Sequence, residues 1–95
     1  MKIIDEELAA VVLKELADSL RGRVRSISAE VQDCGYFILI RIEQDSSGIG
    51  ESCEIIECVK PIMNRLIDKR ENDYSWMINM EYRGALLDSE IGGQI

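Results

Sequence analysis

The chain contains no histidine, and basic residues are few: 11 Lys plus Arg stand against 18 Asp plus Glu, for a formal charge of −7. Histidine is the usual proton-transfer group near neutral pH and the commonest metal ligand. A serine or cysteine nucleophile would also lack its usual base. We therefore expect a protein that is not an enzyme and needs neither a metal nor an organic cofactor. The acidic balance also disfavours nonspecific binding to nucleic acid or anionic lipid, because both require a basic surface.

Long apolar runs are missing too. The longest, residues 36–40, is far too short to cross a membrane. The amino-terminal residues turn acidic at Asp5 before a secretory signal develops. Three cysteines, an odd number, favour reduced thiols, so we expect a cytoplasmic protein. Cys53 and Cys58 would point about 140° apart on a helix, which argues against a disulfide or a shared metal between them.

The composition is that of one folded domain. The chain has 95 residues, of which 46% are hydrophobic and 31% charged. These fractions are ordinary for a small globular protein with a single core. We place one compact α+β domain in residues 1–85. Residues 86–95 contain Gly92-Gly93 and no sustained apolar pattern, so we expect a flexible C-terminal tail there.

Hydrophobic periodicity predicts five elements in the order helix, strand, strand, helix, strand. The first helix has apolar residues at every fourth position after an Asp5 N-cap, and the first two strands form a hairpin through a glycine-containing turn. Pro61 interrupts the second helical stripe, so a kink or a helix restart is expected there. The predicted segments are a helix over 5–21, strands over 23–31 and 36–43, a helix beyond a flexible loop at 45–52, and a strand over 75–83.

Two helices with one apolar stripe each can cover only one face of a three-stranded mixed sheet. The expected fold is therefore a two-layer α/β sandwich with both helices on one face and the other face open. Phe37, Leu39 and Met77 are predicted on the open face, where clustered apolar side chains often mark contacts. The alternative is an uneven surface without a binding role. We favour a protein-interaction domain that self-associates, as a homodimer, through these three residues.

The outer sides of both predicted helices are acidic. Glu54 and Glu57 face away from the second apolar stripe and are expected to steer a basic protein partner. A purely solubilising helix face is the alternative. A steering surface of this kind would suit a toxin-neutralising or inhibitory protein, of the immunity type, that masks a basic target.

One basic cluster stands out in this acidic chain. Arg21, Arg23 and Arg25 fall within five residues and make an anion or RNA contact a weaker alternative. Their structural explanation is equally direct. Arg21 suits a helix C-terminus, where a cation complements the dipole. Arg23 and Arg25 can lay their stems over apolar neighbours while their guanidinium groups reach solvent.

The glycines of residues 48–50 match neither the dinucleotide-binding nor the P-loop pattern, and a flexible connection is expected there. The order of elements, with this glycine-bearing acidic loop before the second helix, resembles the N-terminal domain of the bacterial ribosome-maturation factor P family over roughly residues 5–83. That family usually continues into a Ser-Pro-Gly segment, whereas residues 82–85 here read Tyr-Arg-Gly-Ala. No functional residue is carried over. The resemblance implies an RNA-associated or ribosome-assembly module as a further alternative.

Overall fold

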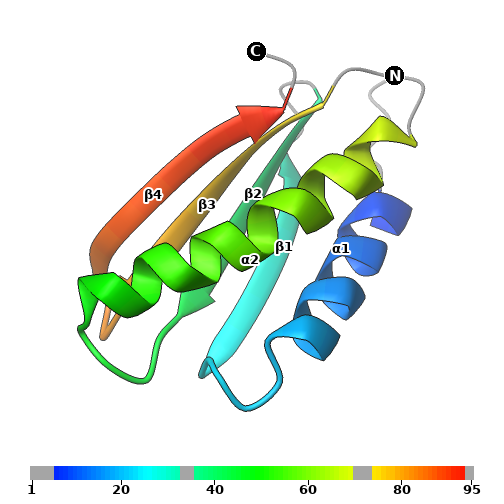
Figure 1. Cartoon of the computed structure of the whole chain (residues 1–95). Helices are drawn as coiled ribbons and strands as arrows, with labels where there is room; N and C mark the ends of the chain where they lie inside the picture. The colour runs from blue at the N-terminus through cyan, green and yellow to red at the C-terminus, as the bar shows by residue number, and fades with distance from the viewer. Residues whose placement is uncertain (1–5, 33–35, 70–73, 94–95) are drawn as a thin grey trace.

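The computed structural model of the chain describes residues 6–32, 36–69 and 74–93. Two helices, each followed by two strands, lie in these ranges, and the α+β class is confirmed. In chain order the elements are α1 (Glu6–Ser19), β1 (Ser26–Gln32), β2 (Phe37–Glu43), α2 (Ile49–Asp68), β3 (Ser75–Tyr82) and β4 (Ala85–Gly93) (Figure 1).

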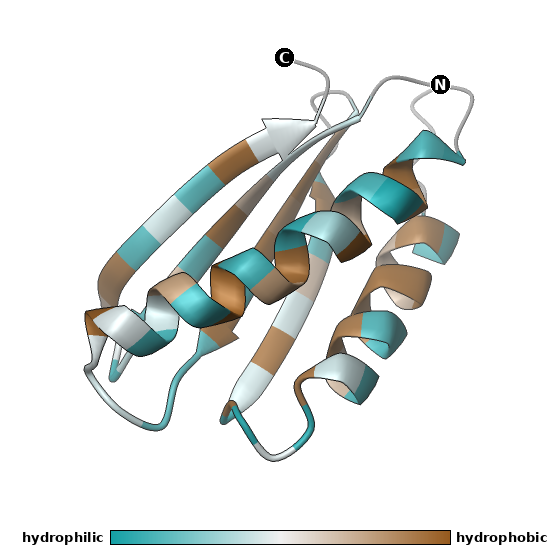
Figure 2. Ribbon diagram, viewed as in Figure 1, coloured by the Kyte–Doolittle hydropathy of each residue, from teal (hydrophilic) through white to brown (hydrophobic). Residues whose placement is uncertain are grey.

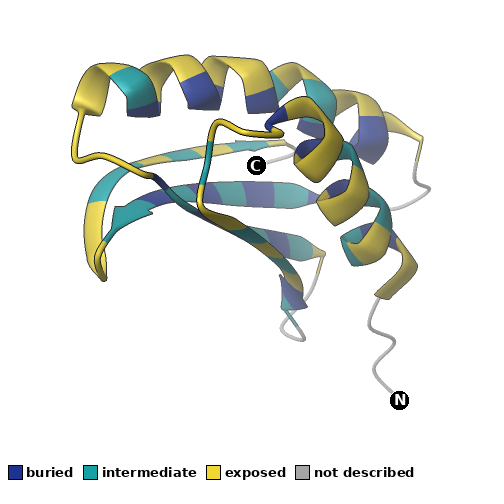
Figure 3. Cartoon of the chain, turned by 90° about the horizontal axis from the view of Figure 1, so that it is seen from below, coloured by how far each residue is buried: buried dark blue, intermediate teal, exposed yellow. Residues whose placement is uncertain are grey.

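The strands form one mixed sheet in the order β1-β2-β3-β4. β1 and β2 are antiparallel, β2 and β3 parallel, and β3 and β4 antiparallel. The parallel pair follows from connectivity, because α2 carries the chain back across the sheet between β2 and β3. Both helices lie on the same side of the sheet, and the described residues place no helix on its other side (Figure 3).

The predicted three-stranded sheet and C-terminal tail are wrong. The segment expected to be a tail contributes most of β4, which pairs with β3 along its length. The two strands are joined by Arg83 and Gly84, whose φ angles are 49° and +81°. Positive φ at both positions is typical of a type I′ turn, whose twist matches that of the strands, and glycine adopts it without strain.

The core lies between the helices and the sheet, where the apolar residues of both layers face each other (Figure 2). Each large apolar side chain buried there contributes about 1.5–3 kcal/mol before the entropy cost of folding. Trp76 is 1% exposed, and its indole Nε1 donates a hydrogen bond to Asn64 Oδ1 at 3.2 Å. The fully buried apolar residues include Leu8, Val12, Leu16, Ile38, Ile40, Ile42, Ile55, Val59, Met63, Ile78 and Met80.

The second helix differs from its prediction in two ways. It begins at Ile49, inside the segment expected to be a loop, and it continues through Pro61 to Asp68 without a restart. Pro61 is exposed. The carbonyl of Glu57, which has lost its partner N–H, therefore lies on the side of the helix that water can reach.

The short loop before α2 is fixed by buried polar side chains. Gln44 is 1% exposed, and its Nε2 donates to the carbonyl oxygens of Ser46 at 3.0 Å and Gly48 at 3.2 Å. The hydroxyl of Ser52, also buried, donates to Gln44 Oε1. Buried polar groups are stable only when hydrogen-bonded in this way. The loop is therefore a hydrogen-bonded turn, in contrast to the flexible connection that its glycines predicted.

Candidate interaction surfaces

Four apolar side chains lie together on the sheet face that no helix covers. The register places Leu39 opposite Met77 and Met77 opposite Ile91, in three neighbouring strands. Phe37 is two residues from Leu39 and shares its face, because side chains alternate along a strand. Phe37, Leu39 and Met77 are partly exposed, and Ile91 is 51% exposed. We call these four residues the open-face patch.

The structure thus brings together the three apolar residues that the sequence singled out. Sequence reasoning missed Ile91, because it lies in the segment expected to be a tail. The alternation of Leu87, Ser89 and Ile91 was the available signal, and it was weakened by the acidic residues between them and the two glycines that follow. The contact role of the patch stays a prediction.

Charged side chains beside the open-face patch are paired with one another. Arg41 Nε lies 2.9 Å from Glu81 Oε2, and its second contact, from Nη2 to Oε1, measures 3.1 Å. This bidentate pair raises the pKa of Arg41, first through the hydrogen bonds that Arg41 donates to Glu81 and second through the negative charge of that carboxylate. Arg25 Nε lies 3.2 Å from Glu43 Oε1. These four charges therefore compensate one another, while the exposed Glu30, which lies opposite Leu39 in β1, adds one negative charge beside the patch.

Glu54 and Glu57 belong to a different surface. Both lie on α2, in the layer of helices on the far side of the sheet from the open-face patch (Figure 3). Their side chains are 76% and 71% exposed, and each has one cation near it. Glu54 Oε2 is 4.0 Å from Arg23, and Glu57 Oε1 is 3.6 Å from Lys60. The five predicted contact residues therefore form two separate surfaces.

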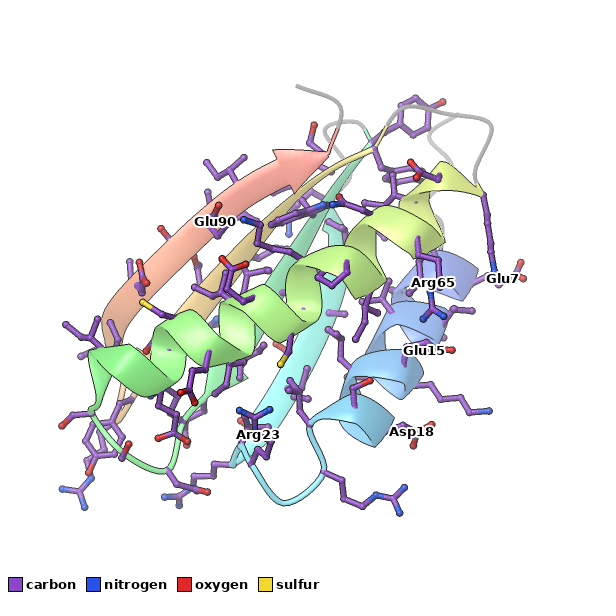
Figure 4. The ribbon with its side chains drawn as sticks, viewed as in Figure 1. Glu7, Glu15, Asp18, Arg23, Arg65 and Glu90 are labelled. Atoms are coloured by element: carbon purple, nitrogen blue, oxygen red, sulfur yellow. The ribbon has the colours of Figure 1, made fainter. Side chains whose placement is uncertain are left out.

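The arginine cluster lies in and just after the turn between α1 and β1, and each member has a carboxylate neighbour. Arg21 pairs with Asp18 at 3.2 Å, Arg23 lies 4.0 Å from Glu54, and Arg25 pairs with Glu43. Figure 4 shows Arg23 below α2 and Asp18 on the outer side of α1. Exposed pairs of this kind are weak, so a stronger anionic partner can displace them.

A shallow groove of about 230 Å³ lies between α1 and the start of β1. Its apolar lining comes from both elements and from the turn that joins them. We call it the α1–β1 groove. Sequence reasoning did not find it, although Leu13 widens the apolar stripe of the first helix and is 38% exposed. The lining residues are Leu13, Ala17, Leu20, Arg21, Gly22, Val24, Arg25, Ser26 and Ile27.

The described cysteines, Cys53 and Cys58, are free and exposed on α2. Cys58 Sγ accepts a hydrogen bond from Arg23 Nη1 at 3.6 Å, and Cys53 Sγ lies 4.0 Å from Asp88 Oδ2. Cys34 lies outside the described residues. Within the described ranges, no three side chains of metal-ligating type gather at one point. Neither α1 nor α2 is long and apolar enough to span a bilayer.

Comparison with known proteins gives no counterpart: no protein-family model, no curated protein and no solved structure matches the chain.

Proposed function

We propose that the chain is a small, non-enzymatic protein-interaction domain that self-associates through the open-face patch. One observation carries the proposal. Apolar side chains from β2, β3 and β4 stand next to one another on the one sheet face that no helix covers. Two such faces can pack with side chains interdigitated about 10 Å apart, as the two sheets of a β-sandwich do. The free, exposed thiols of Cys53 and Cys58 are consistent with a reducing compartment such as the cytoplasm.

The distribution of charge supports a second copy as the partner at this face. The two helices together carry eight carboxylates and three cationic side chains. Two copies that approached through their helices would repel each other. At the open face, Arg41 pairs with Glu81 and Arg25 with Glu43. Association through the open face therefore meets the least repulsion.

The free edge of β4 is a poorer place for self-association. Asp88 and Glu90 share the helix-facing side of this strand, because they pair with the buried Met80 and Ile78. The register also shifts between Met80 and Glu81. Inward-pointing charges and bulges both discourage an edge from pairing with another chain. This leaves the face of the sheet, rather than its β4 edge, as the contact between copies.

The test is the oligomeric state of a double variant, Phe37→Ser with Leu39→Ser. Sedimentation equilibrium should show association weakened at least about tenfold, because the contact between copies no longer buries these two large apolar side chains. The helical circular-dichroism signal should be retained. As a control, Ile49→Ser removes an apolar side chain that is 60% exposed but lies outside the patch, and should leave association unchanged. A double variant that unfolds would place both residues in the core and contradict the proposal.

A further inference from the structure

Met77 brings a reactive sulfur atom to the middle of the open-face patch. It lies between Leu39 of β2 and Ile91 of β4, and it is partly exposed. The other three members of the patch have hydrocarbon side chains. The other methionines in the described part of the chain, Met63 and Met80, are both 0% exposed in the core. Among the described methionines, Met77 is therefore the one that a dissolved oxidant can reach.

Hydrogen peroxide oxidises a methionine thioether to a sulfoxide. A lone pair on sulfur attacks one peroxide oxygen, the O–O bond breaks, and the second oxygen leaves as water with both hydrogen atoms. Sulfur loses two electrons and the peroxide gains them. A sulfoxide reductase, with a thiol as electron donor, restores the thioether. The forward step requires only that the oxidant reach the side chain, which the partial exposure of Met77 allows in a single copy.

A sulfoxide at Met77 would lack a hydrogen-bond donor once two open faces were in contact. The side chains of Leu39 and Ile91 beside it have no polar atoms. β3 pairs with β2 on one side and β4 on the other, so its main-chain N–H groups are used within the sheet. Arg41, the next residue of β2 on this face, already donates to Glu81. Burying a polar oxygen without a partner is unfavourable, so the sulfoxide opposes the contact.

We propose that Met77 is an oxidative modification site, at which hydrogen peroxide dissociates the copies of this protein. The role of the site rests on the self-association proposed above. The two events are linked, because a sulfoxide weakens the contact and the contact shields Met77 from peroxide. In a symmetric contact each copy contributes its own Met77, so two oxidised copies bind each other more weakly than an oxidised copy binds a reduced one.

Sedimentation equilibrium before and after peroxide treatment tests the proposal, with peptide mass spectrometry to locate the sulfoxide. Sulfoxide should form at Met77 before it forms at the buried Met63 and Met80. Association should then weaken at least about tenfold, and a sulfoxide reductase should restore it. Unchanged association after oxidation of Met77 would overturn the site while leaving self-association in place. An untreated protein that is monomeric would contradict self-association itself.

Two variants separate Met77 from the cysteines, which peroxide also oxidises. Met77→Leu keeps the apolar volume but cannot form a sulfoxide, so it should associate like the wild type before and after treatment. All three cysteines are present in both proteins, so any effect of thiol oxidation would appear in both. Met77→Gln introduces a polar side chain and should associate weakly without peroxide. Equal loss of association in the treated wild type and Met77→Leu would assign the effect to the thiols and overturn the proposal.

The shielding of Met77 by a second copy gives an independent measurement. In excess peroxide, the rate of sulfoxide formation at Met77 should fall as the protein concentration rises through the range in which copies associate. The Phe37→Ser and Leu39→Ser variant, whose copies associate weakly, should react at one rate over the same range. A wild-type rate that did not depend on protein concentration would mean that the contact leaves Met77 uncovered, which would contradict the proposal.

Discussion

Trp76 and Gly92 show how one residue's size fixes a contact between strands. They lie opposite each other in β3 and β4, and the indole covers the glycine on the helix side of the sheet. A Cβ added at Gly92 would meet Trp76 Cζ2 and would lie 2.6 Å from both Cε2 and Cη2. Real Cβ contacts are never so short, and Trp76 is 1% exposed, so the indole has no free space to move into. Glycine is required here by packing.

Gly92→Ala should therefore destabilise the protein by about 1–3 kcal/mol, the usual cost of overfilling a packed core. The chain has one tryptophan, so urea unfolding followed by its fluorescence reports directly on this contact. The emission spectrum of the folded variant should shift as well, because the indole must leave its place.

Gly50→Ala is the matched control. An added Cβ at Gly50 has no heavy atom within 4 Å, and the residue lies in α2. Alanine is the better helix former by up to about 1 kcal/mol, so stability should stay the same or rise slightly. If the two alanine variants were equally stable, the packing of Trp76 on Gly92 would not be what requires glycine.

At the scale of elements, the sequence predicts best where one pattern dominates. The fourfold spacing from Leu8 to Leu20 predicts α1 to within two residues at its C-terminal end, because few other structures have that period. Alternation from Phe37 to Glu43 likewise predicts β2 and places Phe37 and Leu39 on one face. The start of α2 was missed, since Gly48 and Gly50 are more typical of turns than of a helix.

β4 was missed for a different reason. Its helix-facing positions carry Asp88, Glu90 and Gly92, none of which signals a buried strand. Each is accommodated by a residue distant in sequence. Glu90 Oε1 lies 3.5 Å from Lys60 Nζ, and Gly92 accommodates the indole of Trp76. These compensations are tertiary, so local periodicity cannot show them.

Hydrogen exchange tests whether β4 behaves as a strand. Amides of residues 85–93 that point toward β3 should be protected, while those on the free edge of β4 should exchange quickly. β3 lies inside the sheet, so its amides on both sides should be slow and serve as the internal reference. Uniformly fast exchange across residues 85–93 would instead show that this segment is the flexible tail that its composition predicts.

At the scale of the whole molecule, strand order could not be read from the sequence. Periodicity shows which residues are buried but not which edge of a hairpin a later strand will join. Here β3 pairs with β2 and β4 extends the same side. This order brings Leu39, Met77 and Ile91 into one row. The acidic helices therefore lie on the opposite side of the sheet from a face whose charges are mostly paired, and self-association through that face should be sensitive to salt.

Association of two copies through the open-face patch should strengthen as salt is added. Each copy has a formal charge of −7, so copies repel one another, while the contact itself is apolar. The screening length falls from about 10 Å at about 0.1 M salt to about 3 Å at about 1 M. Sedimentation equilibrium at these two concentrations should therefore give the tighter dimer at the higher one.

A double variant separates this general repulsion from local contacts. Glu54→Gln with Glu57→Gln removes two negative charges from α2, on the far side of the sheet from the patch. At about 0.1 M salt the variant should associate more tightly than the wild type, and at about 1 M the two should converge, because the removed charges are then screened. The Phe37→Ser and Leu39→Ser variant should stay weak at both concentrations. Association that weakens with salt would instead mean that attraction between opposite charges, rather than the apolar patch, holds the copies together.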